Sequence, residues 1–209
     1  MVPRRGTVKS RNMARDRRTE ILDVAGEIFL DQGYAAASMS AIAARLGGSK
    51  GTLYNYFTSK EELFRAHIER QCGLSAENIF AGETGGEDLA ALLTDLGIRY
   101  LTRLSSDEMM RHLRTVISEA GRNPEIGTLF FESGPARGRA RLSGIFERAA
   151  AEGRLKAPDP VRAADQFLGL CQSTTYKRRL FNVGKSPTRA EIRKDVEAAV
   201  ATFMAAFGG

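Results

Sequence analysis

Residues 38–63 read SMSAIAARLGGSKGTLYNYFTSKEEL, and they predict two short helices joined by a tight turn. Ser38 and Ser49 stand where a side-chain oxygen can cap the free N–H groups at the start of a helix. Gly47 and Gly48 lie between the two helices and permit the backbone angles of a sharp turn. Two helices joined by a glycine turn at this spacing indicate a helix-turn-helix arrangement, which limits how this part of the chain can fold.

The second short helix has an apolar inner side and a polar outer side. The apolar residues that face inward from the two helices are Ile42, Leu46 and Leu53. The outer side presents hydrogen-bonding groups, a methyl group and aromatic rings from Lys50, Thr52, Tyr54, Asn55 and Tyr56. Such a helix fits the major groove of DNA, which is about 12 Å wide. Gly51 would let the backbone approach DNA closely, and the helix starts at Ser38 and Thr58, with Lys60 beyond, suit phosphate groups.

The rest of the chain has the 3.6-residue periodicity of helices, and no alternation long enough to indicate a strand. Helices are expected over 17–32, 39–46 and 50–57, and a long one from the Ser59 cap towards Phe80. Further apolar stripes predict helices throughout residues 89–207, with the penultimate one near 161–180 and the last from about 190. The expected fold class is therefore all-α.

Charge is concentrated at the start of the sequence. The net charge of +6 equals the excess of seven basic residues over one acidic residue within residues 1–18. A basic arm ahead of a neutral body indicates electrostatic binding to a polyanion, because Lys and Arg side chains that reach phosphates release bound counterions. The same arm could lie on RNA or on anionic lipid.

Other function classes find little support in the residues. No apolar run is long enough for a bilayer and residues 1–18 lack the apolar block of a secretory signal, so a cytoplasmic protein without membrane association is expected. Cys72 and Cys171 fit no paired metal spacing, and His67 and His112 lack a further ligand at metal spacing. No nucleotide-binding or hydrolase motif occurs. We therefore expect no metal, no cofactor and no enzymatic activity.

The stretch from Arg17 to Phe64, with SKGTLYNYFTSKEELF as its hallmark, resembles the DNA-binding domain of the TetR/AcrR family. The resemblance implies that the positions of Lys50, Gly51, Thr52, Tyr54 and Tyr56 lie in or beside the DNA groove, and that those of Ser38, Ser40 and Lys60 touch the DNA backbone or adjacent bases. The full predicted DNA-binding set is Ser38, Ser40, Ser49, Lys50, Gly51, Thr52, Tyr54, Asn55, Tyr56, Thr58 and Lys60. The chain departs from the family pattern at Gly48, usually a small apolar residue, and at Tyr56, often a histidine.

The stretches RTVISEAGRNPEIGTLFFESGPARGRARLSGIFERAAAEGRL and DPVRAADQFLGL are similar to the C-terminal domain of AefR-like family members. This resemblance implies a helical domain that binds a small-molecule effector and forms a homodimer through the last two helices. The apolar residues chosen as cavity lining are Leu96, Tyr100, Met109, Met110, Leu113, Ile117, Phe131 and Phe167, although each aromatic could equally fill a core. The expected organisation is a flexible basic arm (1–16), a three-helix helix-turn-helix domain (17–64) and a ligand-binding and dimerisation domain (65–209).

These features favour a transcriptional regulator that is released from palindromic double-stranded operator DNA when it binds a small molecule. A soluble carrier or enzyme with vestigial DNA binding is the alternative. Tight ligand binding without salt-sensitive DNA binding would favour that alternative.

Overall fold

The computed structural model of the chain describes the backbone of residues 6–81 and 88–209, and side chains from residue 16 onward within those ranges. The helices in the described ranges are α1 (Gly6–Gln32), α2 (Met39–Arg45), α3 (Lys50–Tyr54), α4 (Lys60–Ile79), α5 (Leu89–Leu104), α6 (Asp107–Ala120), α7 (Pro124–Ser133), α8 (Pro135–Ala151), α9 (Pro160–Cys171), α10 (Thr175–Leu180) and α11 (Arg189–Phe207). Within the described ranges, β-structure is limited to one isolated bridge between Leu155 and Gly208. The all-α prediction is confirmed.

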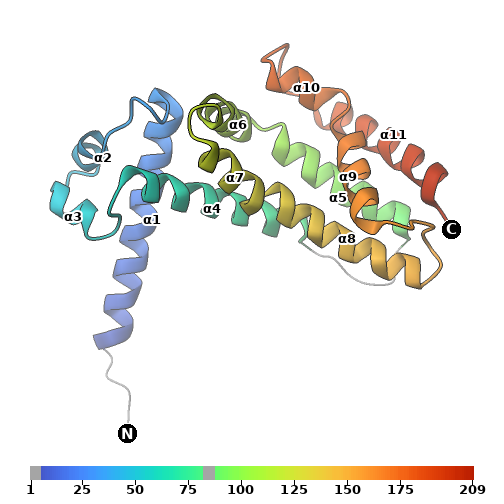
Figure 1. Cartoon of the computed structure of the whole chain (residues 1–209), viewed down its shortest axis with the longest axis horizontal. Coiled ribbons are helices and arrows are strands. Elements are labelled where there is room, and N and C mark those ends of the chain that lie inside the picture. Colours follow the sequence, from blue (N-terminus) through green and yellow to red (C-terminus); the bar gives the residue numbers. More distant parts are fainter. Residues whose placement is uncertain (1–5, 82–87) are drawn as a thin grey trace, which may run out of the picture.

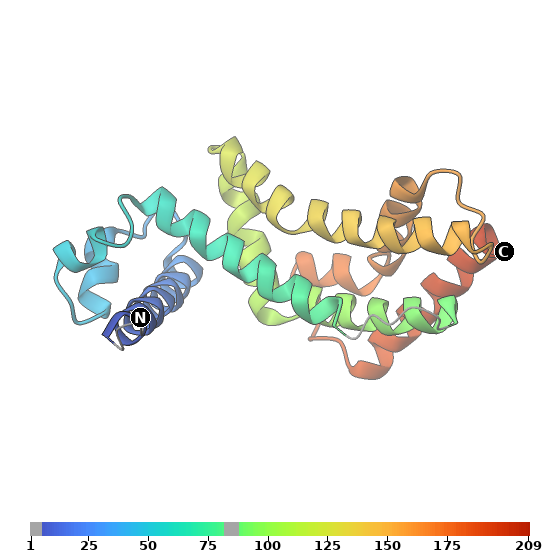
Figure 2. The ribbon, with the colours of Figure 1, turned by 90° about the horizontal axis from the view of Figure 1, so that it is seen from below.

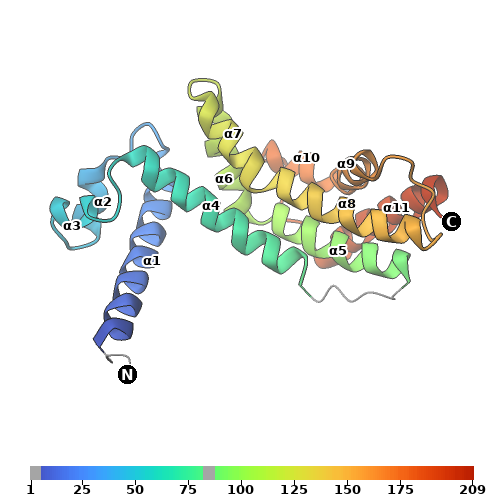
Figure 3. The ribbon, with the colours of Figure 1, turned by 60° about the horizontal axis from the view of Figure 1, so that its bottom comes forward.

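Helices α1 to α3 form a small group at one end of the molecule, and the C-terminal part of α11 lies at the opposite end (Figures 1 and 2). Helix α4 leaves the small group and runs along the body beside α7 (Figure 3). None of the helices in the described ranges has both the length and the apolar character needed to cross a membrane.

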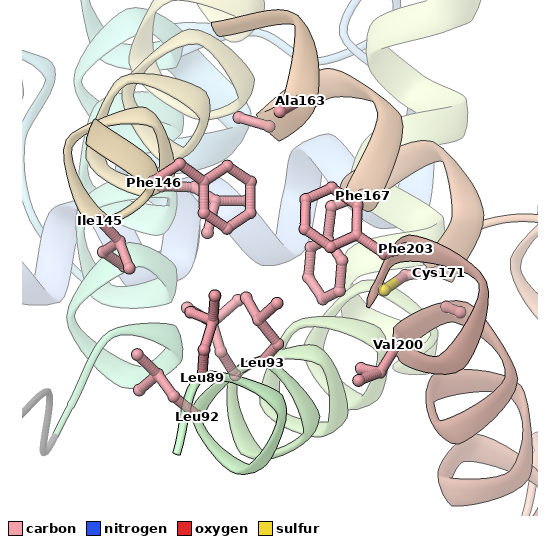
Figure 4. Packing of buried hydrophobic residues seen from close by; sticks show 14 of the residues in the cluster. Leu89, Leu92, Leu93, Ile145, Phe146, Ala163, Phe167, Cys171, Val200 and Phe203 are labelled. Carbon is pink, nitrogen blue, oxygen red and sulfur yellow. The ribbon is translucent and has the colours of Figure 1, made fainter. Parts of the chain in front are cut away.

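Two buried clusters account for this arrangement. One cluster contains residues of α1, α2, α3 and α4. It also includes Val116 of α6 and Ile126 and Leu129 of α7. The other lies among α5, α8, α9 and α11, and its rings and leucines point towards one another in Figure 4. The first cluster crosses from the helix-turn-helix group into the body, so the two parts share packed side chains.

Three helix boundaries differ from the sequence-based expectation. Helix α1 begins at Gly6 rather than near Arg17, because residues 7–16 hold no proline or glycine that would stop it. Most of the expected flexible arm is therefore helical, and the 27-residue helix is about 40 Å long. Helix α3 ends at Tyr54, short of the expected Phe57.

The penultimate helix is broken after Cys171 into α9 and α10. The break falls where the backbone N–H and the hydroxyl of Thr175 both donate to the Asp195 carboxylate on α11. Threonine side chains that bond elsewhere compete with the helical hydrogen-bond ladder. An apolar stripe cannot reveal this bond to a distant helix.

Candidate DNA-binding surface and ligand cavity

The predicted caps and turn of the helix-turn-helix are present. The Ser38 hydroxyl accepts from the backbone N–H of Ala41 at 3.1 Å, and the Ser49 hydroxyl accepts from that of Thr52 at 3.2 Å. Gly47 has a φ of +64°, a conformation that residues with a Cβ rarely adopt. These local bonds fix the starts of α2 and α3 where the sequence predicts them.

Helix α3 is anchored by its apolar side and open on its polar side. Leu53 and Phe57 are fully buried against α1 and α4. The predicted contact residues that lie exposed are Ser38, Ser40, Ser49, Lys50, Gly51, Tyr54, Asn55 and Thr58, with Tyr54 at 47% exposure. Thr52 and Tyr56 are half-buried, and Tyr56 packs against the cluster of the helix-turn-helix group. The exposed residues belong to the start of α2, to α3 and to the segments that flank α3.

The hydroxyls of Thr58 and Ser49, both in the predicted DNA-binding set, already have protein partners. The Thr58 hydroxyl and backbone N–H both donate to the Glu62 carboxylate, at 2.6 and 2.7 Å. These bonds hold the pKa of Glu62 below its usual range. The Ser49 hydroxyl lies 3.1 Å from the Thr52 hydroxyl in addition to capping α3. Both donors of Thr58 are therefore used within the chain, and a phosphate at this position would have to replace the Glu62 carboxylate.

The contacts of Lys60 differ from the sequence-based expectation that its charge binds a phosphate. Its ammonium donates to the carbonyls of Tyr34, Ala35 and Ala37 at 2.9, 3.3 and 3.0 Å, and lies 4.4 Å from the centre of the Tyr34 ring. All three N–H groups of an ammonium are thereby used. Lys60 ties the loop before α2 to the start of α4.

Tyr34 completes the same junction. Its hydroxyl donates to the Glu61 carboxylate at 3.1 Å, and its ring packs 4.7 Å from the ring of Phe64. Burial, followed by the neighbouring Glu61 carboxylate, raises the pKa of Tyr34 to about 12, so the phenol remains a donor. The loop that positions Ser38 is therefore held by α4, which also lines the cavity described below.

Replacing Lys60 by methionine is expected to lower the free energy of unfolding by about 1–3 kcal/mol, because three carbonyls lose a charged donor. The matched control is Lys50→Met on exposed α3, for which a change within about 0.5 kcal/mol is expected. Urea denaturation followed by circular dichroism measures both. Equal stabilities for the two variants would show that the Lys60 contacts contribute nothing.

The body encloses a cavity of about 410 Å³ between α4 and helices α5 to α10. Its walls are predominantly apolar, and its size lies in the range of small-molecule sites. The predicted residues that line it are Leu96, Tyr100, Met109, Leu113 and Phe131. These side chains come from α5, α6 and α7, which the sequence does not place side by side.

Three predicted lining residues lie elsewhere. Met110 is fully buried in a small cluster with Met109 and Leu113 and is not part of the cavity lining. Ile117 is 56% exposed, one turn beyond the residues of α6 that face inward. Phe167 packs fully buried against Phe146 and Phe203 in the core. A helical stripe identifies apolar residues but not which of them face a void.

Sequence reasoning missed the polar part of the lining. Arg103 reaches the cavity from α5, and Gln172 reaches it just after α9. Gln172 donates through its side-chain amide to the Tyr100 hydroxyl. Polar residues that interrupt an apolar stripe, as Arg103 does in α5, are the signal that could have found them.

A pair of histidines lies where α1, α4 and α6 meet, beside the cavity. The rings of His67 and His112 are 5.0 Å apart between centres, and Nδ1 of His67 lies 3.2 Å from the Leu22 carbonyl oxygen. Burial lowers the pKa of His67 and lowers that of His112 to about 4. Both imidazoles are therefore neutral at pH 7.

Comparisons with known proteins agree with this architecture. Residues 21–67 match the family model of the bacterial regulatory proteins of the tetR family. Residues 91–209, more than half of the chain, match that of the AefR-like transcriptional repressor C-terminal domain. The curated relatives include the transcriptional activator FasR of Mycolicibacterium smegmatis, 41% identical over 81 residues, and the repressor KstR2 of Rhodococcus jostii, 35% identical over 82 residues. These matches cover 38% and 37% of this chain, and 35% and 40% of the two relatives.

Two solved structures are similar over nearly their whole length. A TetR-family regulator from Mesorhizobium loti superposes with a TM-score of 0.85 at 26% identity, covering 93% of this chain and 98% of that chain. The flavonoid-responsive regulator FrrA superposes with a TM-score of 0.78 at 33% identity, covering 92% and 98%. The two family models, these superpositions and the helix-turn-helix geometry agree: the chain belongs to the TetR family of bacterial regulatory proteins, with a C-terminal domain of the AefR-like type.

Proposed function

We propose that the chain is a ligand-responsive transcriptional repressor that binds operator DNA through α3 and acts by binding rather than by catalysis. The observation that carries the proposal is the exposed polar face of α3, held by two capped helix starts and a buried apolar side. The basic residues of positions 1–18 add sequence-independent attraction for phosphates. The AefR-like description as a repressor favours repression, although FasR is named an activator.

A homodimer formed through α9 to α11 is part of the proposal. A two-fold axis would present two copies of α3 about 34–36 Å apart, which matches successive major grooves of a palindromic site. Ligand binding in the cavity would favour a dimer geometry in which this spacing no longer fits. The printed description of FrrA as flavonoid-responsive supports a small-molecule response.

The test is fluorescence anisotropy of the full chain on DNA from its own upstream region and on scrambled DNA, at several salt concentrations. We expect specific, salt-sensitive binding with two protomers per site. Tyr54→Ala is expected to cost about 1–3 kcal/mol on the operator and little on scrambled DNA, because Tyr54 is the aromatic residue of α3 and is 47% exposed.

The control is Leu74→Ala on α4, which is 44% exposed and outside both the α3 surface and the cavity lining. It should leave operator binding unchanged. Equal affinity for upstream and scrambled DNA, together with failure of a genome-wide DNA selection, would favour the carrier or enzyme alternative.

A further inference from the structure

The charged groups that line the cavity already neutralise one another. The three guanidinium nitrogens of Arg103 donate to the Ser75 hydroxyl at 2.9 Å, to Glu108 at 2.7 Å and to the Gln71 side-chain carbonyl at 3.3 Å. Arg139 lies 3.5 Å from the Asp165 carboxylate. Each arginine of the lining therefore has its own carboxylate. A ligand with a net charge of either sign would add an unbalanced charge to a lining whose charges are already paired.

Aromatic rings reach the cavity from several helices. They belong to Phe80, Tyr100, Phe130, Phe131 and Tyr176. The rings come from the end of α4, from α5, from α7 and from α10. Such rings stack favourably on a flat aromatic ligand, in offset or edge-to-face arrangements. A flexible aliphatic ligand would gain burial without these ring contacts.

Tyr100 provides a hydrogen-bond donor within these walls. Its hydroxyl oxygen accepts from the Gln172 side-chain amide, which leaves its O–H to donate to another group. Burial raises the pKa of Tyr100, so the phenol stays protonated. An oxygen of the ligand placed against Tyr100 would satisfy this donor.

We propose that the cavity binds an uncharged aromatic compound whose carbonyl or hydroxyl oxygen accepts a hydrogen bond from Tyr100. The proposal rests on the proposed ligand-responsive function and names the chemical class of the ligand. The paired arginines select against net charge, the rings select a flat aromatic body, and the Tyr100–Gln172 pair orients it.

The test is titration calorimetry of the full chain with four probes of different chemistry. Flavone is uncharged, aromatic and carries one carbonyl; 3-methylflavone-8-carboxylic acid adds a negative charge to the same ring system; ethidium is aromatic and cationic; 1-decanol is uncharged and aliphatic. We expect flavone to bind at least tenfold more tightly than each of the other three.

Tyr100→Phe is expected to weaken flavone binding by about fivefold to tenfold, since it removes one buried hydrogen bond. Leu74→Ala, on α4 and outside both the α3 surface and the cavity lining, should leave flavone binding unchanged. Circular dichroism and thermal unfolding would confirm that both variants fold.

The proposal is overturned if the anionic, cationic or aliphatic probe binds as tightly as flavone, if no probe binds, or if folded Tyr100→Phe binds flavone with unchanged affinity. Operator binding is measured separately on the same preparations. Intact operator binding without flavone binding would refute the ligand class alone, whereas flavone binding without operator preference would refute the proposed repressor.

Discussion

Phe203→Ala is expected to lower the free energy of unfolding by about 3–5 kcal/mol, among the largest effects of any single substitution in this chain. Phe203 is fully buried on α11, where its ring stacks 5.0 Å from that of Phe146 and meets the edge of Phe167 at 5.4 Å. Figure 4 shows these three rings pointing into one core from α8, α9 and α11. Removing the ring loses its buried area and leaves a void that rigid neighbours cannot fill.

The measurement is equilibrium urea denaturation at fixed protein concentration, because a dimer's apparent stability depends on concentration. Leu74→Ala is the control, since Leu74 is 44% exposed on α4, outside the helices of the proposed dimer interface. Its expected change is within about 0.5 kcal/mol. If the two variants lost equal stability, the core among α5, α8, α9 and α11 would not be the one described.

Local sequence signals predicted the helix-turn-helix well, because they act over a few residues. Ser38, Ser49 and Ser59 each accept from a backbone N–H three residues later, as their positions before apolar stripes predict. Gly47 supplies the positive φ that the turn requires. Caps and turns depend on neighbours in sequence, so the sequence alone can specify them.

The cavity and the Lys60 junction were less predictable, because they depend on contacts between distant helices. Phe167 and Tyr100 lie on similar apolar stripes, yet Phe167 fills the core and Tyr100 lines the cavity. Lys60 follows the Ser59 cap in a position that suits a phosphate, but the carbonyls that it binds lie 23 to 26 residues away. Periodicity gives the apolar face of a helix, and only the packing of all helices decides what that face meets.

Acidification from pH 7 to pH 4 is expected to lower the free energy of unfolding by about 3 kcal/mol through His112 alone. Its pKa is about 4 in the folded chain because of burial first and the neighbouring His67 second. In the unfolded chain it returns to about 6.5. Between these values the unfolded chain binds a proton that the folded chain excludes, so stability is fully present above pH 6.5 and falls as pH approaches 4.

The surroundings of the pair explain why a proton is excluded. Nε2 of His67 and Nε2 of His112 are both buried without a hydrogen-bond partner among the described residues. Glu108 lies 3.8 Å from His112 Nε2, but its other carboxylate oxygen accepts from Arg103. Arg70 and Arg111 add positive charge nearby, against Asp23 on α1. The backbone of Gly26 packs directly against the His67 ring, since a Cβ at this position would lie 2.3 Å from His67 Cε1.

His112→Leu replaces the imidazole with a side chain of similar volume that cannot bind a proton. Between pH 7 and pH 4 this variant should therefore lose less stability than the natural chain. Urea denaturation at pH 7 and pH 4 gives the two differences. Because the chain has two histidines, proton NMR of their ring resonances during a pH titration assigns each pKa by comparison with the variant. A folded-state pKa for His112 near 6.5, or the same loss of stability in both proteins, would show that the junction of α1, α4 and α6 accepts charge and is more open than its packing indicates.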